Sequence, residues 1–149
     1  MNGFARIVAA LWLGSGFFLV IAASAAFAAA GDATTAADVV GAMLSRWHYI
    51  ALLAPVILLL IEWRRARTAM IALTFLAVVF AASQGFIDLR IRTIRASSPM
   101  AISAMPRNSP LRRHFGMLHG LSSLLLVVQV LVAMVTVVAQ PEPKPKDAV

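Results

Sequence analysis

Residues 115–139, FGMLHGLSSLLLVVQVLVAMVTVVA, form an apolar run that contains no Asp, Glu, Lys or Arg. A helix needs about 20 mostly apolar residues to cross a bilayer core about 30 Å thick, so this run is long enough to span a membrane. Three further runs, at residues 7–30, 47–62 and 68–87, are almost free of charge. The sequence therefore predicts an all-α integral membrane protein, a four-helix bundle formed by a single domain over residues 1–139.

The overall composition agrees with a chain whose solvent is lipid. Hydrophobic residues make up 61% of the sequence and charged residues 13%, and the mean hydropathy of +0.87 lies outside the range of ordinary soluble domains. The chain has no cysteine, which excludes disulfides, thiolate metal sites and thiol catalysis. The net charge is +7, but the arginines lie between the apolar runs and are not interleaved with aromatic residues. We therefore expect lipid headgroups as their counterions and no nucleic acid as a partner.

The connections between the runs set the topology. Residues 62–67, EWRRAR, leave room only for a tight turn, so the second and third helices should be antiparallel neighbours. Four spans place both termini on the same side of the membrane. Basic residues are nearly balanced between the two sides, so the positive-inside rule decides little. We expect cytoplasmic termini, because the first run resembles a signal anchor and, at about 24 residues, is too long for a cleaved signal peptide.

Two expectations concern the first half of the chain. The first helix is rich in small residues such as Gly14, Ser15 and Gly16, which let neighbouring backbones approach closely, so we expect it to lie inside the bundle. Residues 31–45 are predicted to form a turn and then a short interfacial helix that leads into the second span. Thr35 or Asp38 is the expected cap of this short helix.

The second half carries a longer polar connection. After residue 87 the pattern becomes that of an amphipathic helix, so the third helix is predicted to continue beyond the membrane. Asp88 and Arg92 form an i, i+4 pair on one face of this extension. Residues 140–149 are rich in proline and charge, and are predicted to be disordered.

Polar residues gather in one leaflet of the predicted bundle. The second and fourth helices enter the membrane from the same side, so His48, His114 and His119 belong to one leaflet. Asp88 and Arg90 fall there as well, where the third helix leaves the membrane. We interpret His48 and His114 as residues of the membrane interface that face solvent or headgroups.

His119 lies deepest among these histidines, and Ser122 and Ser123 follow it one turn along the same helix. A histidine within a span is expensive and usually faces the bundle. The structural interpretation is that His119 hydrogen-bonds across helices to a serine, a backbone carbonyl or Asp88. The Gly-x-x-x-Gly pattern at residues 116–120 would permit close helix contact beside it.

Two cofactor hypotheses compete with that interpretation. His48 and His119 are candidate axial ligands of a b-type haem held between facing helices. Their depths would differ by roughly 7 Å along the membrane normal, which opposes this alternative. A metal site formed by these histidines and Asp88 lacks any motif of ligand spacing. We therefore expect no cofactor, no metal and, because no nucleophile with a base and an acid is evident, no enzymatic activity.

Two segments resemble the transmembrane protein 205-like family of small four-helix membrane proteins. They are residues 113–123, RHFGMLHGLSS, and residues 86–90, FIDLR. Residues 24–27, SAAF, depart from the Pro-x-x-Phe that the family has near the end of its first helix. The resemblance implies a four-span bundle, but the family brings no settled activity. Its matched positions in this chain are Asp88, Arg90, His119, Ser122 and Ser123.

The expected function follows from many close-packing residues and little evident chemistry. We expect a non-enzymatic accessory or structural subunit of a larger membrane assembly, placed in the cell membrane of a bacterium, with other membrane subunits as partners. The alternative is a small transporter, or a ligand- or haem-binding membrane protein, that uses the cluster of His119, Asp88 and Arg90. The full set of candidate site residues is His119, Ser122, Ser123, Asp88, Arg90, Arg92 and His48.

Overall fold

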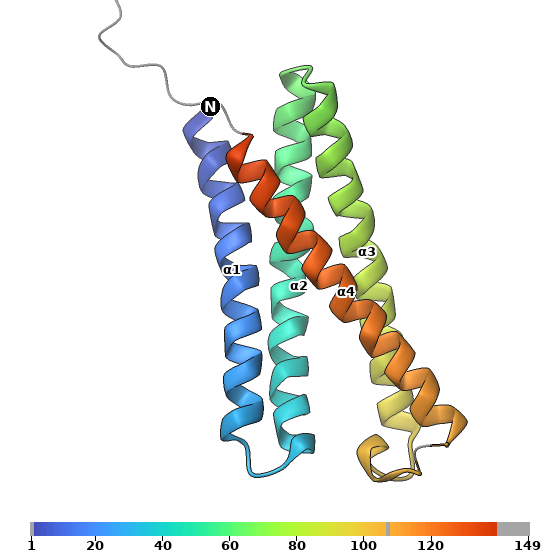
Figure 1. The fold of residues 1–149 in the computed structure, drawn as a ribbon. Coiled ribbons are helices and arrows are strands. Elements are labelled where there is room, and N and C mark those ends of the chain that lie inside the picture. Colours follow the sequence, from blue (N-terminus) through green and yellow to red (C-terminus); the bar gives the residue numbers. More distant parts are fainter. Residues whose placement is uncertain (1, 107, 140–149) are drawn as a thin grey trace, which may run out of the picture.

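The computed structural model describes residues 2–106 and 108–139, and over these residues the chain is helical, with no strand. Four long helices form the bundle, and a short 3-10 helix, η1, lies in the last connection (Figure 1). All four are long and apolar enough to cross a membrane. The predicted disordered tail, residues 140–149, lies outside the described residues. The elements are α1 (Asn2–Ala29), α2 (Ala33–Arg64), α3 (Thr68–Ser97), η1 (Ile102–Ala104) and α4 (Pro110–Val138).

The helices alternate in direction and form a ring in which each packs against two others. α2 and α3 are antiparallel neighbours, as the short turn predicts. α4 crosses the bundle obliquely, from α3 at the lower end of Figure 1 to α1 at the upper end. The upper end is where α1 begins, α4 ends and the α2–α3 turn lies. The lower end holds the α1–α2 turn and the longer connection before α4.

Small side chains dominate the interface between helices. Ala9, Ala51, Ala77 and Ala133 are fully buried, and the larger Trp12 fills the space between them. Lipid tails are as apolar as leucine, so helices in a membrane gain from close backbone approach more than from burying large side chains. The large apolar side chains lie mostly on the outer surface, where Leu11, Phe18, Leu60, Phe75, Met117 and Val138 are exposed.

α1 does not occupy the interior position that its small residues predict. Its buried share is the smallest of the four spans, 22% against 28–33% for the others. One face, which includes Trp12, Gly16 and Leu19, packs against the bundle. A Cβ atom added at Gly14 would meet no atom of another helix within 4 Å, so its small size serves no contact within the chain. The expected close approach does occur at Gly16, where an added Cβ atom would lie 2.8 Å from Cγ2 of Val130. The prediction is wrong for the helix as a whole, because most of its surface lies on faces away from the other helices.

α2 is one continuous helix and not a short interfacial helix followed by a span. It begins at Ala33, and the side chain of Asp32 caps it by accepting 2.8 Å hydrogen bonds from the backbone N–H groups of Thr34 and Thr35. The predicted caps were therefore wrong, since Thr35 is a donor here and Asp38 faces α3. As a result, residue 48 lies in the middle of the helix rather than at its start.

α3 runs past residue 87 as predicted and ends at Ser97. Residues 65–67 form the turn between α2 and α3, where Ala66 adopts a left-handed backbone with φ of 51°. Because α2 starts early and α3 ends late, the two helices stay paired to the lower end of the bundle. Their paired lower halves position the candidate site.

Candidate functional site

A cleft of about 640 Å³ opens at the lower end of the bundle. It exists because α4 leans away from α1 at this end and packs on α3 there instead (Figure 1). α1 contributes only Phe27 to the lining, whereas α2, α3 and α4 supply the walls. The polar and charged lining residues are Asp38, Ser45, Arg46, Tyr49, Asp88, Arg92, Arg95, His119, Ser122 and Ser123.

A hydrogen bond between α3 and α4 fixes one wall of the cleft. The Ser122 hydroxyl, only 5% exposed, donates to the Asp88 carboxylate at 2.8 Å. The sequence predicts a polar contact between these helices and assigns it to His119. The structure assigns it to Ser122 instead, because Ser122 lies on the buried face of α4 and His119 on the exposed face.

His119 lines the cleft together with Asp88 and Arg92. Its ring stacks in parallel with Phe115, one turn earlier, with ring centroids 6.2 Å apart. Among the described residues its side chain has no hydrogen bond, while its backbone carbonyl accepts one from Ser123. The imidazole therefore adjoins the cleft with both nitrogens available to a ligand.

The arginines of the cleft differ in how they are held. Arg95 forms an ion pair with Asp38 at 3.1 Å and lies 5.5 Å above the Phe115 ring. Arg46 donates to the carbonyl of Ala42, one turn toward the lower end, at 3.1 Å. Within the described residues, Arg92 makes no hydrogen bond or ion pair. The predicted Asp88–Arg92 pair is absent there, because the Asp88 carboxylate is turned to Ser122.

Two predicted site residues lie outside the cleft. Arg90 is exposed and sits 5.1 Å above the ring of Phe86 on its own helix. His48 is half-buried against α3, where a side chain at Gly85 would come within 2.3 Å of its Nε2 atom. Its Nδ1 atom is also buried. The interpretation of His48 as a solvated interfacial residue is therefore wrong, because α2 begins well before residue 47.

Further up the bundle, several buried polar side chains bond to one another or to their own helices, whereas Nε1 of Trp12, Nε2 of Gln84 and Oε1 of Gln129 have no hydrogen-bond partner among the described residues. Gln129 of α4 donates to the side-chain carbonyl of Gln84 on α3, and both residues are fully buried. Thr74 and Thr136 are fully buried as well, and each donates to a carbonyl four residues earlier on its own helix. Of these contacts, the hydrogen bond between Gln129 and Gln84 ties α3 to α4 above the cleft.

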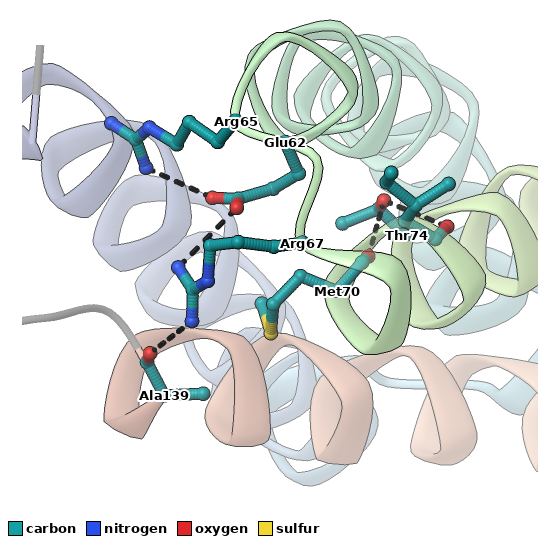
Figure 2. A network of polar contacts seen from close by, with 7 residues as sticks. Glu62, Arg65, Arg67, Met70, Thr74 and Ala139 are labelled. Carbon is teal, nitrogen blue, oxygen red and sulfur yellow. Dashed lines mark hydrogen bonds and ion pairs between the residues drawn. The ribbon is translucent and has the colours of Figure 1, made fainter.

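The upper end holds a charged network that the sequence prediction missed. Glu62 lies between Arg65 and Arg67 (Figure 2). Its side chain is fully buried, and the N–O distances to the two arginines are 3.0 and 3.3 Å. Arg67 also donates to the carbonyl of Ala139 at 2.8 Å, which ties the α2–α3 turn to the end of α4. The sequence feature that indicates this network is a single acidic residue at the end of an apolar run, followed by three arginines.

Neither the metal nor the haem hypothesis gains support from this geometry. No three His, Asp or Glu side chains of the described residues are grouped so that they would hold a metal ion. His48 packs on α3, whereas His119 lines the cleft. Comparison with protein-family models, curated proteins and solved structures finds no match to this chain. The resemblance to the transmembrane protein 205-like family therefore stays a prediction.

Proposed function

We propose that all four helices cross a membrane, with the upper end of the bundle on the cytoplasmic side. Support comes from the belt of exposed large apolar side chains between two charged ends. Counted from Glu62, a membrane core about 30 Å thick takes up about 20 residues of α2, at 1.5 Å per residue. The second boundary then lies near Ala42, and the paired lower ends of α2 and α3 project into the headgroups and beyond.

Within that frame, the protein is a non-enzymatic binding protein whose ligand is anionic and occupies the lower cleft. The observation that carries this function is the position of Arg46, Arg92 and His119. They line the same cleft from three different helices, and among the described residues the side chains of Arg92 and His119 make no hydrogen bond, while Arg46 makes one, to the carbonyl of Ala42. A structural role would pair these groups with acceptors of the chain, as happens at the upper end.

Binding fits the interior better than transport does. A transport path needs polar groups that continue from the cleft through the bundle. Above the cleft, Gln84 and Gln129 bond to each other, and the buried threonines bond to their own helices. The glutamine pair is of the kind that holds membrane helices together.

A second candidate function, an accessory subunit, is favoured by one feature of α4. The Gly-x-x-x-Gly pattern was expected to serve contacts beside His119 within the bundle, yet a side chain added at Gly116 or Gly120 would meet no atom within 4 Å. Such a pattern permits close approach of another helix in lipid. Gly120→Leu should abolish co-purification of a partner in mild detergent if this role is correct, with Gly3→Leu as the control.

Native mass spectrometry of the protein, released from membranes in mild detergent, tests the binding function. The wild-type chain should retain an anionic species, and Arg92→Gln should lose it. Arg90→Gln is the matched control, because Arg90 is an exposed arginine two residues away that does not line the cleft. Equal retention by both variants, or no retained ligand in the wild type, would exclude this function.

A further inference from the structure

The position of the cleft along the helices indicates which part of a membrane its ligand would contact. His119 lies 20 residues before Ala139 on α4, and Asp88 lies 21 residues after Arg67 on α3. At 1.5 Å per residue both are about 30 Å along their helices from the Glu62 network, the thickness of a bilayer core. If that network marks one boundary, the polar lining of the cleft lies at the other, where phosphates of lipid headgroups begin.

The open side of the cleft faces the region where lipid tails would lie. α1 and α4 diverge toward the lower end, and the lower part of α1 is largely exposed, with Phe27 at 52%. His119 and Ser123 on α4 line the same cleft as Phe27 on α1, and both are exposed. Apolar side chains continue into the cleft, contributed by Val40, Leu44, Ile91 and Leu126.

Arginines outnumber carboxylates in the lining of the cleft, by three to two. Asp38 is paired with Arg95, and Asp88 accepts a hydrogen bond from the neutral hydroxyl of Ser122. Arg92 makes no such contact among the described residues. Arg46 uses one Nη1 bond on Ala42, which leaves most of the five N–H donors of its guanidinium free. Arginine donors suit a phosphate because they bind two of its oxygens at once.

We propose that the anionic ligand is a phospholipid with an anionic headgroup, which enters sideways between α1 and α4. Its phosphate lies among Arg92, Arg46 and His119, and an acyl chain leaves the cleft past Phe27 and Leu126. This inference rests on the binding function proposed above and adds the chemical class of the ligand. Basic pockets between membrane helices are a known type of headgroup site. The cleft volume is within the range of about 300–1,000 Å³ typical of ligand pockets.

Lipid titrations of the purified, delipidated chain in neutral detergent test this proposal, with bound mass read by native mass spectrometry. The probes are phosphatidylglycerol, zwitterionic phosphatidylcholine and inorganic phosphate. We expect phosphatidylglycerol to bind at least about tenfold more tightly than the other two, because only it offers both net negative charge and acyl chains. Arg92→Gln and Arg46→Gln should each weaken its binding about tenfold, the value of one charge-assisted hydrogen bond. Arg90→Gln should bind as the wild type does.

A steric variant separates a lipid from a free phosphate. Ser123→Leu narrows the opening beside α1 without changing any charge, so it should weaken phosphatidylglycerol binding. Equal binding of phosphatidylglycerol and phosphatidylcholine would overturn the proposal, as would inorganic phosphate that binds as tightly as the lipid. If a soluble anion is retained in an Arg92-dependent way, the lipid assignment fails and the binding function stands. If no Arg92-dependent anion is found, both fail.

Discussion

The two ends of the bundle use charged residues in opposite ways. At the upper end, the carboxylate of Glu62 is fully buried, and Arg65 and Arg67 close around it within a short turn. At the lower end, Arg92 and His119 border a cleft, and among the described residues neither side chain makes a hydrogen bond or ion pair, while the His119 ring stacks with Phe115. A fully buried charge must be compensated or it destabilises the fold. An exposed charge without a partner costs little and is free for a ligand.

If the proposed binding function is right, the comparison separates charges that stabilise the fold from charges that bind a ligand. Substitutions in the Glu62 network should lower stability, whereas substitutions of Arg92 and Arg46 should lower ligand binding and leave stability nearly unchanged. Substitutions at positions from one end of the bundle to the other test this division.

Arg67→Met should cause the largest loss of stability. It removes one cationic neighbour of the buried Glu62 carboxylate and the donor to the carbonyl of Ala139. Removing one partner of a buried ion pair costs about 3 kcal/mol. Chemical unfolding in detergent micelles measures the loss. Arg64→Met is the matched control, because Arg64 is exposed. If both variants unfold alike, the upper network is not what holds this end together.

Gly85→Ala tests the packing between the two ends. The added methyl would lie 2.3 Å from Nε2 of His48, so the imidazole or the helix must shift, at a cost of about 2 kcal/mol. Gly41→Ala, on the facing helix, has its nearest atom at 3.9 Å and should be neutral or slightly stabilising. Combining Gly85→Ala with His48→Ala should recover stability relative to Gly85→Ala alone. A Gly85→Ala protein as stable as Gly41→Ala would show that His48 does not pack there.

Ser122→Ala should have a moderate effect at the lower end. It leaves the Asp88 carboxylate without its donor from α4, a loss of about 1 kcal/mol. Ser123→Ala should be close to neutral, because that hydroxyl bonds to a carbonyl of its own helix. Thermal unfolding in one detergent compares the two. A larger loss for Ser123→Ala would contradict the assignment of the interhelical bond to Ser122.

The smallest effect concerns the start of α2. Hydrogen bonds from the Thr35 side chain and then its backbone lower the pKa of Asp32 below 3.8. This carboxyl has a lower pKa in the folded state than in the unfolded state. Its contribution to stability is therefore complete at pH values above the unfolded-state pKa, and it is lost as the pH falls through the folded-state pKa. Asp32→Asn keeps a capping oxygen without the titration. Its stability should fall less than that of the wild type between pH 5 and pH 2, and parallel curves would argue against this role.

Much of the fold follows from the sequence because long apolar runs separated by short polar segments are typical of helices that can cross a membrane. The apolar runs gave the number of helices, and the short turn at residues 65–67 gave the pairing of α2 with α3. The start of α2 was missed because residues 33–45 are only weakly apolar, and they form helix through pairing with the lower part of α3. The Asp32 cap stabilises that early start.

The candidate site was predicted in part. Asp88, Arg92, His119, Ser122 and Ser123 do line one cleft. Helix period alone did not reveal which of them faces inward, so the interhelical bond was assigned to His119. The Asp38–Arg95 pair could have been predicted from the sequence, because both residues are almost equally distant along the chain from Ala66, in the turn between the antiparallel α2 and α3. His48 and Gly85, which also face each other, are likewise almost equally distant along the chain from Ala66. The cleft itself depends on the oblique path of α4, which no local pattern encodes.

The most direct test measures the rise in unfolding temperature that phosphatidylglycerol causes in the wild-type protein and in Arg92→Gln, in the same neutral detergent. At a fixed concentration, a ligand that binds only the folded state raises that temperature more the more tightly it binds. The two proteins should unfold at nearly the same temperature without lipid, and only the wild type should gain a clear increase with it. An Arg92→Gln protein that is destabilised without lipid, or that gains the same increase, would contradict the division between a structural and a binding end.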